Sequence, residues 1–303
     1  MKLLRFVPFI ALAACNSNNS VTSANNTIAP QQEVARGTRD LSSTFKDYWY
    51  GGTAEISSYD LQQARYGEMR NGTAIMVFVT EPMDLQGQVK ADRDVKTNIS
   101  VMKLNATRDF NTGIYPYTIM SSTFLPLDAQ VNAIKITASV QEWCGHTYMQ
   151  FNNRGARYEV ALHSYFQSEG DTTLTLPNVV TENQLPLQLR LDPAAMPQGN
   201  FKLIPSAEFL RLKHVKTAAI DVAATLTTHD KSYEYRIDMP ALDRTVTYVT
   251  QQNFPYRILS WSDRYKEGAN YMETTAVLKK TIQSAYWSKN RNEDEPMRND
   301  LGL

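Results

Sequence analysis

One short region of the sequence brings together side chains that could do chemistry. Cys144 and His146 lie two residues apart, and His163 follows further along the chain. A thiol beside an imidazole is the pattern of a cysteine nucleophile, because a nearby histidine lowers the thiol pKa. The same three side chains are also ligands that zinc accepts. The region therefore raises two chemical hypotheses, covalent catalysis and metal binding.

The elements that would position these side chains are two long strands, predicted at residues 134–151 and 156–167. The turn-type residues Asn152, Asn153, Arg154 and Gly155 lie between them. A turn of this length places Cys144 opposite His163 and His146 opposite Ala161, with Cβ atoms about 4.5–5.5 Å apart. One face is then polar: Glu142, Cys144, His146, Tyr148, Arg157, Glu159, His163 and Tyr165. The other is apolar: Trp143, Met149, Phe151, Tyr158, Val160, Leu162 and Phe166.

Three interpretations of the polar face remain open. It is a nucleophile site, a metal site of Cys144, His146 and His163, or a solvent-exposed strand face whose lone cysteine behaves as a small hydrophobe. A register slip of one residue removes the Cys144–His163 pair altogether. We expect the exposed face, no cofactor, and surface positions for His214 and His229. Dithiol chemistry within one chain is excluded, because no second cysteine follows Cys144.

The N-terminal residues predict where in the cell the protein is located. Lys2 and Arg5 precede a short apolar run that ends in Leu12-Ala13-Ala14-Cys15. This run is shorter than the ~20 residues a spanning helix needs. The segment resembles a bacterial lipoprotein signal peptide, residues 1–14, and the final string resembles a lipobox. The resemblance implies that Cys15 is lipidated and begins the mature chain.

We predict that residues 15–40, which begin with the lipidated Cys15, form a tether between the membrane and the folded part of the chain. They are rich in Asn, Ser, Thr, Ala and Gln and poor in large apolar groups. A flexible coil of ~25 residues reaches roughly 25–30 Å. Two or three acyl chains on Cys15 would hold the protein on a membrane stably. Because no acidic run follows Cys15, we expect the periplasmic leaflet of the outer membrane.

Charge and cysteine content exclude some classes of function. The chain has 31 basic and 31 acidic side chains, and removing Lys2 and Arg5 leaves 29 against 31, a net charge of −2. This balance does not indicate nucleic-acid binding. Once Cys15 is lipidated only Cys144 remains, so an internal disulfide is impossible. Packing must then stabilise the fold.

Strand alternation dominates residues 53–287 and predicts a mostly β protein. We expect a large antiparallel, curved sheet or half-barrel with few short helices. The apolar run 74–79 predicts a central strand after an Asn71-Gly72 turn. Leu41, Phe45, Tyr48 and Trp49 predict a short helix capped by Ser42 or Ser43. The alternating leucines at 185–191 favour a strand.

The predicted organisation is a first β-rich half at residues 41–178, a second at 179–288, and a fraying tail at 289–303. The composition of residues 192–199, with Pro193, Pro197 and Gly199, predicts a connecting loop and makes it the best candidate for a boundary between halves. The strings Tyr115-Pro116-Tyr117 and Phe254-Pro255-Tyr256 share a pattern, each expected to open a strand. This repeated pattern suggests a duplicated β-unit.

The strings Gln141–His146, Ile204-Pro205-Ser206 and Phe254–Ile258 resemble a group of Bacteroidota-type outer-membrane lipoproteins of unknown function. Some of these carry the automatic name "septum formation inhibitor Maf". That name implies a nucleotide pyrophosphatase, but its N-terminal phosphate motif is missing here and its α/β fold disagrees with a β-rich chain. The predicted architecture is also similar to the half-barrel of lipoprotein carriers of the Lol type, which bind acyl chains.

These observations predict a membrane-anchored, periplasmic, non-enzymatic binding module. Its ligand would be a lipid, a peptide or an envelope partner held in a concave sheet, where the many aromatic side chains could line an apolar groove. The alternative is a metal-dependent or cysteine-dependent hydrolase that uses Cys144, His146 and His163.

Overall fold

A computed structural model describes residues 39–129 and 131–303. The predicted signal peptide, Cys15 and nearly all of the tether lie outside these residues. The helices are α1 (Ser43–Trp49), α2 (Leu185–Leu191) and α3 (Ala207–Lys213), with 3₁₀ segments η1 (Glu182–Gln184), η2 (Pro193–Ala195), η3 (Pro240–Leu242), η4 (Tyr286–Ser288) and η5 (Asn292–Leu301). The strands of the first half are β1 (Ala54–Arg65), β2 (Glu68–Asp84), β3 (Val89–Lys90), β4 (Asn98–Thr112), β5 (Tyr115–Pro126), β6 (Lys135–Glu142), β7 (Gly145–Asn153), β8 (Arg157–Ser164) and β9 (Thr172–Pro177). Those of the second half are β10 (Val180–Thr181), β11 (Gly199–Ile204), β12 (Ile220–Thr228), β13 (Ser232–Met239), β14 (Arg244–Gln251), β15 (Ile258–Glu267) and β16 (Asn270–Ser284).

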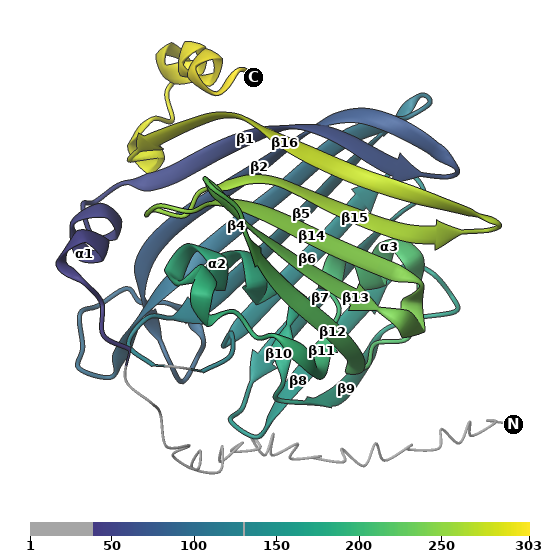
Figure 1. Cartoon of the computed structure of the whole chain (residues 1–303), viewed down its shortest axis with the longest axis horizontal. Helices are drawn as coiled ribbons and strands as arrows, with labels where there is room; N and C mark the ends of the chain where they lie inside the picture. The colour runs from purple at the N-terminus through teal and green to yellow at the C-terminus, as the bar shows by residue number, and fades with distance from the viewer. Residues whose placement is uncertain (1–38, 130) are drawn as a thin grey trace, which may run out of the picture. The chain divides into compact units, whose positions relative to one another are not determined.

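The described strands form one 16-stranded sheet (Figure 1). Its order is β10-β11-β12-β13-β14-β15-β16-β1-β2-β4-β5-β6-β7-β8-β9, with β3 beside β2. The β10–β11 pair is parallel, and the other pairs are antiparallel. The prediction of a large, curved antiparallel sheet with few short helices is confirmed. The two predicted halves share this sheet, because β1 pairs directly with β16.

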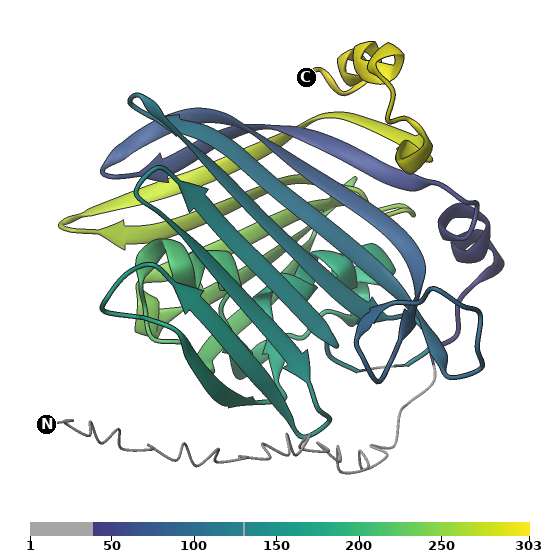
Figure 2. The ribbon, with the colours of Figure 1, turned by 180° about the vertical axis from the view of Figure 1, so that it is seen from behind.

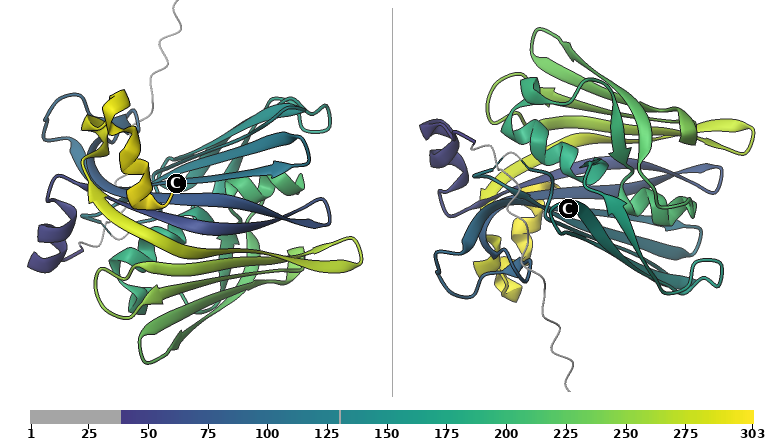
Figure 3. Two further views of the ribbon diagram at one scale, coloured as in Figure 1. Left: turned by 90° about the horizontal axis from the view of Figure 1, so that it is seen from above. Right: turned by 90° about the horizontal axis from the view of Figure 1, so that it is seen from below.

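The sheet folds over so that its two wings face each other (Figure 3). Helices α2 and α3 lie between the wings, as Figures 1 and 2 show from opposite sides. The main apolar core joins Leu187 of α2 to Leu104 of β4 and Val246 of β14. A second core joins Leu210 of α3 to Met149 and Phe151 of β7. The interior of the curved sheet is therefore largely filled by the chain's own helices.

Several local predictions are confirmed. Helix α1 begins after Ser42, whose Oγ accepts a hydrogen bond from the Phe45 N–H at 3.1 Å. The run Ala74–Val79 lies in β2, near the centre of the sheet between β1 and β4. Ala74, Met76 and Phe78 face the main core. Ile75 and Val77 pack on the other face.

The strand predicted over the alternating leucines is wrong, because Leu185–Leu191 forms helix α2. Pro186 lies in its first turn, where the missing N–H has no intrahelical partner to lose. Leu185, Leu187 and Leu189 are all fully buried. Because α2 is buried on most of its surface, with only Gln188 and Leu191 half-exposed, its residues do not show the amphipathic helical period.

The turn predicted at Asn71-Gly72 is also wrong. Both residues lie inside β2, and the hairpin turn is at Tyr66-Gly67, where both residues have positive φ. Gly72 serves a different purpose, since a Cβ there would lie 2.4 Å from the Asp109 carbonyl oxygen on β4. Glycine at this position allows β2 and β4 to approach closely.

The C-terminal residues and the repeated string also differ from expectation. Residues Asn292–Leu301 form η5, and the buried Leu301 packs with Ala54, Ile56 and Val79. The polar composition predicted fraying here, whereas Leu301 and Leu303 both pack against the sheet. Tyr115-Pro116 opens β5, whereas the Phe254–Pro255 bond is cis and precedes β15 in a loop. The two strings thus take different conformations.

Candidate functional site

The predicted Cys144–His163 pair does not form. Residues 143–144 make a tight turn between β6 and β7, so the single long strand predicted at 134–151 is two strands. His163 pairs with Tyr148, and His146 pairs with Gln141. The phase of burial reverses at the turn: Ile136 and Val140 are buried before it, and Met149 and Phe151 after it. In the sequence, this reversal of the apolar alternation is the signal of the turn. It is missed because the dipeptide Trp143-Cys144 lacks the residues typical of hairpin turns.

The surroundings of Cys144 do not activate its thiol. The side chain is exposed, and its backbone N–H donates to Glu142 Oε2 at 2.7 Å. The Glu142 carboxylate raises the Cys144 pKa, opposite to what a nucleophile needs. No group of three or more His, Cys, Asp or Glu side chains in the described residues could hold a metal ion. The predicted metal set of Cys144, His146 and His163 is therefore not assembled.

The remaining interpretation of this region, a polar strand face open to solvent, agrees with the structure. Met149, Phe151, Tyr158, Val160 and Leu162 form the buried face. His163 and His146 are exposed, and His163 Nδ1 lies 3.4 Å from Asp171. Trp143, expected on the buried face, is exposed in the turn. His214 and His229 are at the surface, beside Glu169 and Glu234.

A buried polar network lies between the wings, where η1 and the start of α3 meet the sheet. Arg244 of β14 donates from Nη1 and Nη2 to the two carboxylate oxygens of Glu182, at 2.6 and 2.7 Å. Its Nε and Nη2 also donate to Asp263, at 2.6 and 3.0 Å. Glu182 in turn accepts a hydrogen bond from the Ser206 N–H at 2.9 Å. These contacts fix the residues just before α2 and just before α3 to the sheet.

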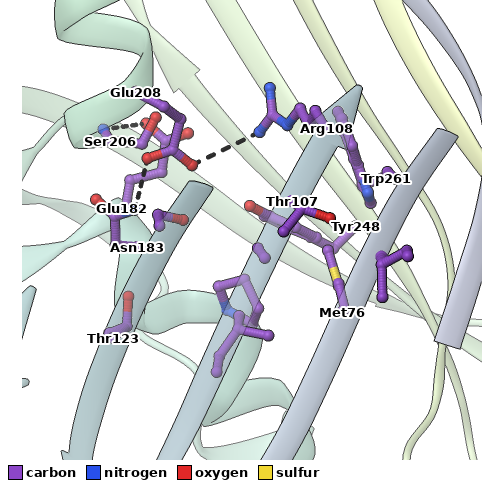
Figure 4. A pocket seen from close by; sticks show the side chains of 16 residues that line it. Met76, Thr107, Arg108, Thr123, Glu182, Asn183, Ser206, Glu208, Tyr248 and Trp261 are labelled. Carbon is purple, nitrogen blue, oxygen red and sulfur yellow. Dashed lines mark hydrogen bonds and ion pairs between the residues drawn. The ribbon is translucent and has the colours of Figure 1, made fainter. Parts of the chain in front are cut away.

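A small cavity opens beside this network (Figure 4). Asn183 Nδ2 donates to Glu208 at 2.8 Å, and Arg108 Nη2 lies 3.6 Å from the same carboxylate. The Arg108 guanidinium stacks on Trp261 at 4.5 Å. The cavity measures about 40 Å³. Since one water needs about 10–15 Å³, it has room for about three waters and none for an acyl chain.

A second ion pair fixes α2 to β1. Arg190 donates to both carboxylate oxygens of Glu55 at 2.6 and 2.8 Å, and both side chains are fully buried. Tyr48 of α1 donates to the same carboxylate at 2.5 Å. Burial by itself raises the Glu55 pKa, but Arg190 reverses this, and the pKa lies below its usual value. The Glu55 carboxylate on β1 is therefore bound both to α2, through Arg190, and to α1, through Tyr48.

A larger hollow than the cavity beside Arg108 is an open groove at the end of the sheet where β1 begins, which we call the rim groove. Its volume is about 750 Å³. Ligand pockets typically measure about 300–1,000 Å³. Its lining comes from the segment before α1, from α1, from the loops before β6 and after β9, from α2 and η2, and from the loop before β15: Arg39, Asp40, Leu41, Ser42, Phe45, Val131, Asn132, Asn178, Gln188, Leu191, Asp192, Ala195, Phe254 and Tyr256.

The rim groove combines apolar and polar surface. Leu41, Phe45 and Phe254 are among the apolar lining side chains, and Phe45 and Phe254 lie with ring centroids 6.4 Å apart. Gln188 Oε1 is buried and has no hydrogen-bond partner among the described residues. The groove thus presents apolar rings together with polar side chains such as Asn178 and Gln188.

Sequence reasoning missed the rim groove for a physical reason. Its lining residues come from segments between residues 39 and 256 that meet only when the sheet folds over. The predicted aromatic groove in the concave face was also misplaced, since α2 and α3 occupy that face. Part of the signal was present in the α1 pattern, because the predicted Leu41 and Phe45 both line the groove.

Among the described residues, no helix is both long and apolar enough to cross a membrane. The sequence matches no protein-family model. It also matches no curated protein. Among solved structures, the comparison found a porin-like protein from Bacteroides uniformis, with a TM-score of 0.20 and 9% identity. That comparison covers 76% of this chain and 95% of the other.

Proposed function

We propose that this protein is a lipid-anchored, non-enzymatic binding protein of the bacterial outer membrane, facing the periplasm, that holds a peptide segment of an envelope partner in the rim groove. The observation that carries the proposal is the rim groove itself, which has the volume of a ligand site and a mixed lining. The anchor is supported by the lipobox-like string that ends at Cys15.

A peptide fits this groove better than a lipid does. The space between the wings, where an acyl chain would lie in a half-barrel, contains Leu185, Leu187 and Leu189 and a cavity of only about 40 Å³. The groove offers polar side chains, including Asn178 and Gln188, beside its apolar ones. A peptide supplies backbone N–H donors together with apolar side chains, which matches both kinds of surface.

Two neighbouring alanines provide a test of the groove. Ala195 lines it, whereas Ala194 does not, and both are exposed. The described residues belong to one compact unit, so an unlipidated chain of residues 16–303 keeps the fold. Peptides displayed on phage and selected on this chain should fail to bind Ala195→Trp and should still bind Ala194→Trp. Selected peptides that bind both variants alike would refute a groove ligand.

The lipid alternative and the anchor need their own measurements. Native mass spectrometry of the protein purified from membranes should show no bound lipid beyond the acyl groups on Cys15. A stoichiometric lipid lost in Ala195→Trp would replace the peptide proposal. For the anchor, cells should incorporate labelled palmitate into the wild-type protein but not into Cys15→Ser. An unlabelled wild-type protein would contradict lipidation.

A further inference from the structure

Three arginines are buried in the described part of the chain: Arg190, Arg211 and Arg244, with exposed fractions of 0%, 3% and 4%. Burying a guanidinium is costly unless carboxylates and hydrogen bonds compensate its charge. Arg190 is compensated by both oxygens of Glu55. Arg244 is compensated by Glu182 and Asp263. In both cases, carboxylates accept hydrogen bonds from the buried guanidinium and compensate its charge.

Arg211, on α3, is not compensated in this way, because no carboxylate accepts a hydrogen bond from its guanidinium among the described residues. Its hydrogen bond is a long one, from Nη2 to Thr217 Oγ1 at 3.3 Å. Its Nε and Nη1 are buried and find no hydrogen-bond partner among the described residues. Nη1 lies 3.0 Å from Glu169 Oε1, close enough for an ion pair but not directed as a hydrogen bond. Burial lowers the Arg211 pKa more than Glu169 raises it.

Arg211 opens into a crevice of about 20 Å³ at the end of the sheet where β1 and β6 end. Arg65 lines the same crevice, and its Nε is also buried without a partner. Arg65 Nη1 and Nη2 donate to the Leu212 carbonyl oxygen at 2.7 Å and to Tyr117 Oη at 3.1 Å, both uncharged acceptors. His214 and Glu142 also line it. Two guanidiniums thus share a space that Glu142 also lines, and Glu169 provides the carboxylate within 3.0 Å of Arg211.

Glu169, on the loop between β8 and β9, lies beside two residues that line the crevice, Arg211 and His214. Its carboxylate is already divided among three partners: Ser164 Oγ at 2.7 Å, His214 Nδ1 at 3.0 Å and Arg211. The same loop carries Tyr165, which is 74% exposed, and Trp143 on the neighbouring turn is 70% exposed. Each of these exposed aromatic residues is the sequence neighbour of a residue that lines the crevice, Phe166 and Glu142 respectively.

We propose that this crevice, enlarged by the space that the Glu169 carboxylate takes up beside Arg211, is an oxyanion-binding site, and that Glu169 lies against Arg211 as an internal substitute for the ligand. The ligand presents a carboxylate or a phosphate group, displaces Glu169, and accepts hydrogen bonds from Arg211 Nε and Nη1 and from Arg65 Nε. Planar guanidinium groups recognise such oxygens through paired N–H donors. The site is separate from the rim groove, at the opposite end of the strands, and does not depend on the peptide proposal.

The test removes the internal carboxylate and measures anion affinity. Inorganic phosphate and acetate are titrated into the 16–303 chain by calorimetry, with sodium chloride keeping the ionic strength constant. Glu169→Ala should bind at least one of them at least about tenfold more tightly than wild type, because a tethered competitor acts at millimolar or higher effective concentration. Glu159→Ala, which removes an exposed carboxylate on β8, should bind like wild type.

Two further variants identify the donor. In the Glu169→Ala background, Arg211→Met should abolish the gain. Arg211→Lys, which keeps the charge but loses the fork, should reduce it, and this variant decides the matter if Arg211→Met does not fold. An equal affinity in Glu169→Ala and wild type for both anions, or a gain that survives Arg211→Lys undiminished, would overturn the proposal.

The source of the oxyanion is distinguished by a second probe. Dihexanoyl phosphatidic acid, below its micelle concentration, carries a phosphate on short acyl chains. Binding to Glu169→Ala tighter than that of inorganic phosphate, and weakened by Trp143→Ser, supports the site with a lipid headgroup as the source. Binding equal to that of phosphate supports the site with a free anion as the source.

Discussion

At the scale of single residues, buried charge determines how this protein is held together. The Glu55–Arg190 pair has no exposed surface, receives a third hydrogen bond from Tyr48, and joins three elements. Pairs at the surface, such as Arg236–Asp238, have similar distances but remain in water. Solvent screening makes the exposed pairs weak, whereas removing one partner of a buried pair leaves an uncompensated charge.

Arg190→Met should therefore lower the free energy of unfolding by about 3–5 kcal/mol, because Glu55 would be left buried and unpaired. Urea denaturation at pH 7 measures this loss. Arg236→Gln is the matched control and should change the free energy by about 0.5 kcal/mol or less. A similar small loss in both variants would show that the buried pair has no special part in stability.

The same pair predicts how stability depends on pH. Because the folded-state pKa of Glu55 lies below its ordinary value of 4.5, the ionised carboxylate stabilises the folded state above that pH. This contribution disappears as the pH falls from about 4.5 through the lowered pKa. Urea denaturation between pH 6 and pH 3 should show a smaller loss of stability in Glu55→Gln than in wild type. Parallel curves would contradict the assignment.

Cys144 should behave as an accessible but unactivated thiol. Glu142 raises the Cys144 pKa, and His163 pairs with Tyr148 instead. The rate of reaction with a disulfide reagent should therefore rise with pH through and above the ordinary thiol range near 8.5. His163→Ala should leave the rate profile unchanged. Rapid reaction at pH 6 that His163→Ala abolishes would restore the nucleophile hypothesis.

At the scale of elements, patterns confined to one element predicted well and patterns that depend on enclosure did not. Ser42 and the spacing of Phe45 and Trp49 predicted α1, and Ala74–Val79 predicted a central strand. The alternating leucines of α2 gave a wrong prediction, because a helix buried on most of its surface between two wings carries leucines on several sides. The hairpin at Trp143-Cys144 was missed because that dipeptide carries no turn signal.

Leu187 tests the structural role of α2. Its side chain is fully buried between the wings, so Leu187→Ala should lower the free energy of unfolding by about 2–5 kcal/mol through lost burial and a cavity. Val277→Ala, at an exposed position on β16, should cost less than about 0.5 kcal/mol. Denaturant titration of both variants compares them, and equal losses would mean that α2 does not belong to the core.

At the scale of the whole molecule, the folded sheet places its features at two ends. The rim groove lies where β1 begins, beside α1, and the Arg65–Arg211 crevice lies where β1 ends. The curved antiparallel sheet itself followed from strand alternation. The sites could not be predicted, because residues as distant as Leu41 and Tyr256, or Arg65 and Arg211, become neighbours only through the fold.

The affinity of a selected peptide for two alanine variants tests the central claim most directly. Ala195→Trp fills the rim groove and should weaken binding at least about tenfold, or about 1.4 kcal/mol. Ala194→Trp adds the same side chain outside the groove and should leave the affinity within about twofold of wild type. Calorimetric titration of the three chains measures both ratios. Equal affinity of Ala195→Trp and wild type would contradict a ligand in the rim groove.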